Sequence, residues 1–220
     1  MFQVQVEEVI LYKLPFLTLA IFLLGVIFRV YRYLSEKLRV FPIFPKAEKN
    51  RVSEYIKDVL LFRALLSSDR KLWLLAWFFH VSLLLILIGH LRMFIGIEFP
   101  ENLSDVLGTI FGLIFILTLL ALLLRRVAEL KEISTLEDYL ALLLLLAIAV
   151  SGMYLRLSDV SLYNYFDALI SGERIEVENQ ILVIHALLAQ ILVAYLPFGK
   201  LFHSIGVFHS NYSALRWKNA

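Results

Sequence analysis

The chain has 220 residues, of which 60% are hydrophobic and only 18% charged, with a formal net charge of +2 and a mean hydropathy of +0.80. A soluble domain of this length carries more charge and fewer apolar residues, so the composition excludes a soluble protein and predicts an all-α membrane protein. The absence of cysteine excludes disulfides, iron–sulfur clusters and a covalently attached c-type haem, and the near-neutral charge gives no indication of nucleic-acid binding.

Long apolar runs predict five transmembrane helices packed in a bundle. They lie at about 9–33, 72–95, 106–124, 136–155 and 179–204. The first residues contain neither a basic segment nor a small-residue cleavage site, so we expect no removable signal peptide. The third helix carries Gly108 and Gly112 in a spacing that lets another helix approach closely, and room for a flat macrocycle explains these glycines equally well. Pro197 and Gly199 interrupt the fifth helix.

The segments between the helices are more polar. Residues 46–71 alternate charged and apolar side chains, which fits an amphipathic helix on the membrane surface or against a partner, and fits a solvated loop equally well. The loop over 156–178 is acidic and rich in turn residues, and the tail over 205–220 is polar and basic.

The distribution of lysine and arginine predicts the orientation of the bundle. Seventeen of these residues fall in 29–71, 125–137 and 199–220, which share one side of the membrane if all five helices cross it, and four fall on the other side. Because cytoplasmic segments carry the excess of positive charge, we expect the N-terminus outside and the C-terminus in the cytoplasm.

Four of the five histidines lie in two of the apolar runs. His80 and His90 are ten residues apart in the second predicted helix, and His185 and His203 are eighteen apart in the fifth. The second helix runs outward and the fifth runs inward, so depth pairs His90 with His185 near the outer face and His80 with His203 near the inner face. At the rise of an α-helix these steps are about 15 Å and about 27 Å, a difference that tilt and a kink at Pro197 must absorb.

Imidazoles in a hydrophobic helix are costly unless something binds them. A single such histidine most often hydrogen-bonds to a neighbouring helix. Four histidines at matched depths on two antiparallel helices instead favour two b-type haems, each iron held between one histidine of each helix. A zinc site would gather its ligands within a few ångströms, which two separated pairs cannot do. The fifth histidine, His209, is expected to be solvated or interfacial.

The segments that carry these histidines resemble a known family. FFHVSLLLILIGH is similar to the second helix of the gamma subunit of respiratory nitrate reductase, and HALLAQILVAYLPFGKLFH is similar to its fifth helix. The five-helix plan, the outside N-terminus and the basic residues after the third helix also fit. That family is a di-haem cytochrome b that oxidises quinol and passes electrons to cytoplasmic partners, so the resemblance implies the same two histidine pairs as haem ligands.

Two features separate the chain from nitrate reductase itself. The nitrate reductase subunit has a lysine near its outer haem, whereas this chain has none between Lys71 and Lys131. The ending KLFHSIGVFHSNYSALRWKN resembles the membrane cytochrome of sulfite-reduction-associated and heterodisulfide-reductase-like complexes. The resemblance implies a subunit of the prokaryotic cytoplasmic membrane that oxidises menaquinol or ubiquinol of the quinone pool for a cytoplasmic iron–sulfur partner, with a nitrate reductase gamma subunit as the alternative.

Several polar residues lie close to the expected haems. Arg92 near the outer haem and Arg126 near the inner one are candidate contacts for haem propionates, and anchoring at the membrane ends is the alternative for both. Gly89 either clears space for a ring or lets a helix pack closely. The outer loop holds acidic residues that fit a quinol base or a solvated surface, namely Glu98, Glu101 and Asp105.

A different class of protein fits the same helices. A non-redox transporter subunit or membrane anchor would use the histidines as proton relays, and it would be colourless where a di-haem cytochrome is red. A cytochrome that reduces ferric iron or oxygen directly is a second rival. The chain has no recognisable nicotinamide or flavin domain and its cytoplasmic segments are short, so we expect one subunit of a larger complex.

Overall fold

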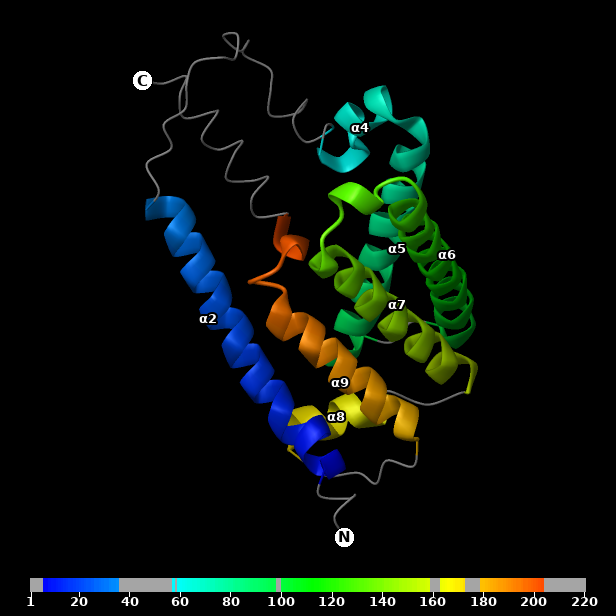
Figure 1. Cartoon of the computed structure of the whole chain (residues 1–220). Helices are drawn as coiled ribbons and strands as arrows, with labels where there is room; N and C mark the ends of the chain where they lie inside the picture. The colour runs from blue at the N-terminus through cyan, green and yellow to red at the C-terminus, as the bar shows by residue number, and fades with distance from the viewer. Residues whose placement is uncertain are drawn as a thin grey trace.

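The computed structural model describes residues 6–35, 57, 59–97, 100–158, 163–172 and 179–203, and within these ranges every regular element is a helix (Figure 1). The elements in chain order are η1 (Val9–Lys13), α2 (Leu14–Ser35), α4 (Arg63–Ser68), α5 (Arg70–Phe94), α6 (Glu101–Ala128), η2 (Lys131–Ile133), α7 (Leu136–Leu157), α8 (Tyr163–Ser171), α9 (Gln180–Tyr195) and η3 (Lys200–Phe202). The all-α prediction is confirmed for the described residues.

Four helical segments are long and apolar enough to cross a bilayer, which takes about 20 residues. They are Val6–Ser35, Arg70–Phe94, Leu103–Ala128 and Leu136–Leu157. Their surfaces expose many leucine, isoleucine, valine and phenylalanine side chains, as expected where lipid replaces water. The prediction of a membrane protein is confirmed. Helix α9 is apolar but only 16 residues long, so the fifth crossing remains a prediction, as does the orientation of the bundle.

The helices pack largely in chain order. Helix α5 packs on α6, α6 on α7 and α7 on α9, while α2 lies along the other side of α9 (Figure 1). Short connections make α5, α6 and α7 successively antiparallel, and α8 crosses the end of the bundle where α5 finishes. One buried apolar cluster lies at the α8 end, formed by Leu11, Leu155, Tyr165, Phe166, Leu182 and Val183. A second lies among α6 and α7, formed by Phe115, Leu119 and Leu145.

A π-helical turn, η1, fixes the start of α2 against its neighbours. A π turn breaks the regular pairing of backbone groups, so its carbonyls need other donors. The Gln190 side chain of α9 donates to the Ile10 carbonyl at 2.8 Å, and the Tyr165 hydroxyl of α8 donates to the Leu11 carbonyl at 3.1 Å. Burial raises the pKa of Tyr165 to about 12, so the hydroxyl stays protonated and able to donate at physiological pH.

Helix α7 begins at a capping box that orients the carboxylate of Asp138. The Thr135 side chain accepts a hydrogen bond from the backbone of Asp138, and the Asp138 carboxylate accepts one from the Thr135 amide at 2.9 Å. This reciprocal arrangement satisfies backbone donors that a helix start leaves without partners.

The fifth predicted helix is shorter in the structure than in the prediction. The sequence predicted a helix over 179–204, whereas α9 ends at Tyr195 and is followed by a turn over 196–199 and by η3. Pro197 has no amide hydrogen to continue the helix, and Gly199 adopts an extended conformation with φ −92° and ψ 172°. A side chain at Gly199 would also overlap the Tyr195 ring, because an added Cβ would lie 2.3 Å from Cζ.

The polar connections differ from the prediction in one other place. The 156–178 loop contains helix α8, whose Tyr165, Phe166 and Ala168 are buried. Of the predicted amphipathic segment 46–71, the described residues include α4, and residues 46–56 lie outside the described part. The tail over 205–220 lies outside it as well.

Candidate functional site

The structure brings the four histidines of the two predicted helices together in two pairs. The ring centroids of His80 and His203 are 5.9 Å apart with the ring planes at 89°. Those of His90 and His185 are 6.3 Å apart with the planes at 20°. We call the first the α4-end pair and the second the α8-end pair, after the short helices nearest to each. His209 lies outside the described residues.

Three of the four rings are held through Nδ1. The Nδ1 of His80 lies 2.7 Å from the Ala76 carbonyl oxygen, and that of His90 lies 2.8 Å from the Ile86 carbonyl oxygen. A carbonyl only accepts, so Nδ1 carries the proton in both rings and donates it to the preceding helical turn. The lone pair is then on Nε2, the arrangement that metal-binding histidines have when a second group fixes their tautomer.

The third ring contacts a hydroxyl. Oγ of Ser151 of α7 lies 2.8 and 3.0 Å from the carbonyl oxygens of Ala147 and Ile148, and 2.9 Å from Nδ1 of His185. When a carbonyl accepts the single hydroxyl proton, Nδ1 donates to Oγ and Nε2 keeps its lone pair. When Nδ1 accepts that proton, Nε2 carries the ring proton. Among the described residues, none forms a hydrogen bond with the ring of His203, which lies at the end of η3.

The spacing of both pairs fits one metal ion between two imidazoles. Imidazole nitrogen binds a metal at about 2 Å, so two rings on opposite sides of one ion have their centroids roughly 6 Å apart. Both centroid distances agree with this value. Imidazoles at this separation fit the two axial positions of a haem iron. The ligand role of these residues remains a prediction.

The surroundings of the rings differ between the two pairs. Gly152 of α7 packs directly against His185, since an added Cβ would lie 3.0 Å from Cε1 of the ring. An added Cβ at Gly89, by contrast, would have no neighbour within 4 Å. At the other pair, Phe62 and Phe79 meet the His80 ring edge-on, with centroids 5.0 and 4.9 Å away. Aromatic rings thus surround one histidine and helix backbone approaches another.

The α8 end carries two arginines. Arg92, a predicted propionate contact, is buried, and its guanidinium donates to the Ser104 hydroxyl. Arg156, at the end of α7, pairs with the carboxylate of Asp105 at 3.1 Å and is close enough to act electrostatically on His90. Asp105 was predicted to lie in the outer loop, whereas it lies near the start of α6, and no role was predicted for Arg156. Of the two other acidic residues, Glu98 lies outside the described residues and the side chain of Glu101 is not described.

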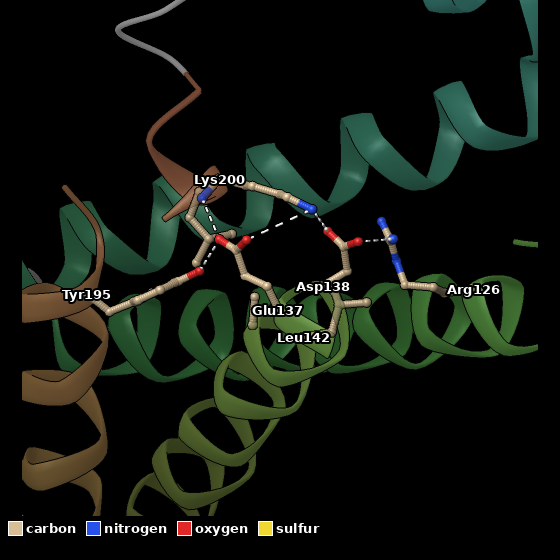
Figure 2. A pocket seen from close by; sticks show the side chains of 8 residues that line it. Arg126, Glu137, Asp138, Leu142, Tyr195 and Lys200 are labelled. Atoms are coloured by element: carbon tan, nitrogen blue, oxygen red, sulfur yellow. Dashed lines mark hydrogen bonds and ion pairs between the residues drawn. The ribbon is translucent and has the colours of Figure 1, made fainter. Parts of the chain in front are cut away.

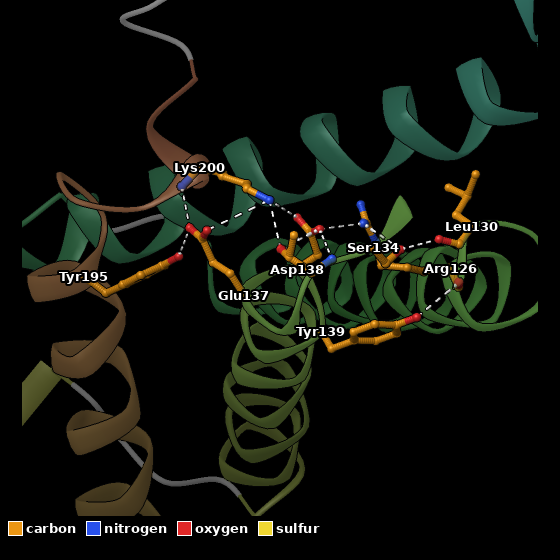
Figure 3. A network of polar contacts seen from close by, with 9 residues as sticks. Arg126, Leu130, Ser134, Glu137, Asp138, Tyr139, Tyr195 and Lys200 are labelled. Carbon is orange, nitrogen blue, oxygen red and sulfur yellow. Dashed lines mark hydrogen bonds and ion pairs between the residues drawn. The ribbon is translucent and has the colours of Figure 1, made fainter. Parts of the chain in front are cut away.

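At the α4 end the cations are tied to carboxylates. Arg126 forms an ion pair with Asp138 at 3.1 Å and donates to the Ser134 hydroxyl at 3.2 Å (Figure 3). Its neighbour Arg125 pairs with Asp69, the N-cap of α5, at 3.0 Å. Both arginines therefore join the end of α6 to the start of another helix. Whether Arg92 and Arg126 also contact haem propionates is untested and stays a prediction.

A pocket of about 190 Å³, lined by charged and apolar side chains, opens beside this network (Figure 2). The residues that line it come from α6, α7, α9 and η3, and include Arg126, Glu137, Asp138, Leu142, Tyr195 and Lys200. The sequence analysis missed Glu137, Tyr195 and Lys200. Their only sequence signal was the position of two acids in the first turn of α7, which is also the ordinary composition of a helix start.

Comparison with known proteins places the chain in a family. The family described as nitrate reductase gamma subunit matches residues 63–218, which include all four paired histidines. The Hdr-like menaquinol oxidoreductase cytochrome b-like subunit of Archaeoglobus fulgidus is 31% identical over 89% of this chain and 76% of its own length. The protein of the same description from Archaeoglobus profundus is 29% identical over 91% and 77%. The resemblance predicted from the two histidine-bearing helices is confirmed, and the chain belongs to the nitrate reductase gamma subunit family.

Proposed function

We propose that the chain is the membrane cytochrome b subunit of a quinol oxidoreductase complex and holds two b-type haems. His90 and His185 would be the axial ligands of one haem, and His80 and His203 those of the other. The observation that supports this proposal is the pairing of four imidazoles at two ends of one bundle, with Nδ1 of His80 and of His90 bonded to a backbone carbonyl so that Nε2 is left to bind a metal. A haem bound at each pair would supply reversible one-electron chemistry.

The descriptions of the relatives support a choice of quinol and of partner. The two Archaeoglobus relatives are described as subunits of a menaquinol oxidoreductase, so menaquinol is the favoured quinol, with ubiquinol as the alternative. Their Hdr-like description favours a cytoplasmic iron–sulfur partner over a nitrate reductase. We propose that quinol is oxidised at the α8 end and that the partner binds at the α4 end. The excess of lysine and arginine at the α4 end supports a cytoplasmic position for that end.

The chain contributes the positions of the imidazoles. Helix α5 carries His80 and His90, α9 carries His185, and His203 follows η3. Apolar clusters pack beside α5 and α9. Buried Arg92 places positive charge at the α8 end, where the charge of Arg156 is balanced by Asp105. Positive charge there favours an anionic propionate or a deprotonating quinol over a neutral one.

The first experiment measures haem content in the purified protein. Pyridine haemochrome analysis and a dithionite-reduced minus oxidised spectrum should give two b-type haems per chain. His90→Ala and His203→Ala should each leave one. The matched control is His209→Ala, which removes the fifth histidine and should keep two. A folded, membrane-inserted preparation without haem would contradict the proposal and would favour packing or proton-relay roles for the histidines.

Orientation can be tested on the same protein because the natural chain has no cysteine. Lys13, whose side chain is 65% exposed, and Lys57 lie on opposite sides in the proposed arrangement. In intact cells a membrane-impermeant maleimide should label Lys13→Cys, and Lys57→Cys only after the cells are opened. The reverse pattern would overturn the orientation without affecting the haem ligands.

A further inference from the structure

The segment that carries His203 is a turn followed by the short helix η3, and side chains of other helices bond to it. In a straight helix His203 would lie about 27 Å along the axis from His185, whereas His80 lies only about 15 Å from His90. The structure nevertheless brings His203 to within 5.9 Å of His80, because α9 ends at Tyr195 and the turn over 196–199 replaces more than one helical turn. The α4-end pair therefore depends on the geometry of this turn.

One carboxylate oxygen joins the two ends of the turn. Oε1 of Glu137 accepts a hydrogen bond from the Tyr195 hydroxyl at 2.5 Å and another from the Lys200 backbone amide at 3.1 Å (Figure 2). Tyr195 is the last residue of α9 and Lys200 is the first of η3. The Lys200 ammonium extends over the start of α7, where it donates to Thr135 at 2.9 Å and to Asp138 at 3.2 Å.

A second side chain holds the turn from the opposite side. Arg29 of α2 donates through Nη1 to the Pro197 carbonyl oxygen at 2.7 Å. The same guanidinium lies over the ring of Phe202, 5.9 Å from its centroid. Helix α2 comes this close because Gly25 faces Pro197, where an added Cβ would lie 2.7 Å from the proline Cβ. The turn is thus held between α7 and α2, two elements far from it in sequence.

We propose that Glu137 is a positioning residue for His203, with Arg29 as the second support. The carboxylate fixes the direction in which η3 leaves the end of α9, and through it the distance between the two imidazoles of the α4-end pair. Glu137 itself has no place in the proposed ligand set. The inference rests on the proposed haem ligation, and it adds a residue that composition and histidine spacing do not identify.

The test compares Glu137→Ala with Glu137→Gln in the purified protein. Alanine removes the acceptor for both donors, whereas glutamine keeps an oxygen at the same reach. With alanine we expect the haem of the α4-end pair to lose its sixth ligand, so that electron paramagnetic resonance shows a high-spin ferric signal and haem content falls from two towards one per chain. The haem of the α8-end pair should stay low-spin. Glutamine should restore two low-spin haems.

Three controls separate the outcomes. Glu132→Ala changes an exposed carboxylate of the same connection and should match the natural protein. If Glu137→Ala does not accumulate, two other variants test the same turn. Tyr195→Phe removes one hydrogen bond to Glu137, and Arg29→Ala removes the contacts with Pro197 and Phe202. Each should shift the spectrum of the α4-end haem alone. Two unchanged low-spin haems in the accumulating variants, or equal loss of both, would overturn the positioning role while leaving the proposed function intact. A natural protein without haem would overturn the proposed function itself.

Discussion

Gly152 offers a direct test of how tightly α7 and α9 pack around the α8-end pair. An added Cβ at this position would lie 3.0 Å from Cε1 of His185, 3.5 Å from Nδ1 and 3.8 Å from Nε2. The ring cannot withdraw freely, because Nδ1 is bonded to Ser151, the residue immediately before the glycine. We therefore expect any side chain larger than hydrogen to move the imidazole or to separate the two helices.

The magnitude follows from two opposing contributions. Overpacking a close contact costs about 1–3 kcal/mol, and replacing glycine by alanine within a helix gains about 1 kcal/mol. Gly152→Ala should therefore change stability by about 0–2 kcal/mol in the destabilising direction. Compared with alanine, valine at this position adds two more methyl groups near the ring and gains less from helix propensity. The net cost of Gly152→Val should therefore be at least about 1–3 kcal/mol.

The assay combines haem content with thermal unfolding in detergent. Gly152→Val should lower the unfolding midpoint and weaken or remove the haem that we propose His90 and His185 bind. Gly152→Ala should have a smaller effect on both. The matched control is Ala147→Val on the exposed face of the same helix, which should leave both quantities unchanged. Two fully retained haems and an unaltered midpoint in Gly152→Val would refute the packing argument.

Substitutions at three further positions test individual hydrogen bonds and one ion pair. Ser151→Ala removes the hydrogen-bond partner of Nδ1 at the α8-end pair and should weaken haem affinity there by about 10–100-fold, measured by haem titration of the apoprotein. Tyr165→Phe leaves the Leu11 carbonyl without its donor and should cost about 1–3 kcal/mol in unfolding free energy. Asp69→Ala removes both the cap of α5 and the ion pair with Arg125, at a cost of about 1–2 kcal/mol. Asp69→Asn keeps the cap and should lose less than half of that.

The spanning helices were predictable because the bilayer imposes one simple demand. A segment in hydrocarbon must satisfy its own backbone groups and carry apolar side chains, so an uncharged run of sufficient length has few alternatives. The observed α5, from Arg70 to Phe94, differs from its predicted range by two residues at one end and one at the other. The depth argument that paired His90 with His185 used only helical rise and direction, and both are fixed by the same demand.

Helix α8 could not be predicted in this way. Its nine residues, YNYFDALIS, show no long apolar run, and the helix depends on burying Tyr165 and Phe166 against residues that are distant in sequence. The end of α9 was only partly predictable. Pro197 and Gly199 signalled an interruption, but the choice between a kinked helix and a full break depends on partners such as Glu137, about 60 residues away.

The two histidine pairs differ in the elements that hold their rings, and this difference follows from the turn after α9. At the α8 end both imidazoles stand on regular helices, and each is fixed by a hydrogen bond through Nδ1. At the α4 end His80 is fixed in the same way, but His203 follows a break and depends on contacts from α7 and α2. A helix resists displacement along its whole length, whereas a clamped turn yields when a single contact is lost. In the proposed complex the α4 end faces the cytoplasmic partner, so docking there would act on the more adjustable of the two ligand sets and leave the α8-end pair unchanged.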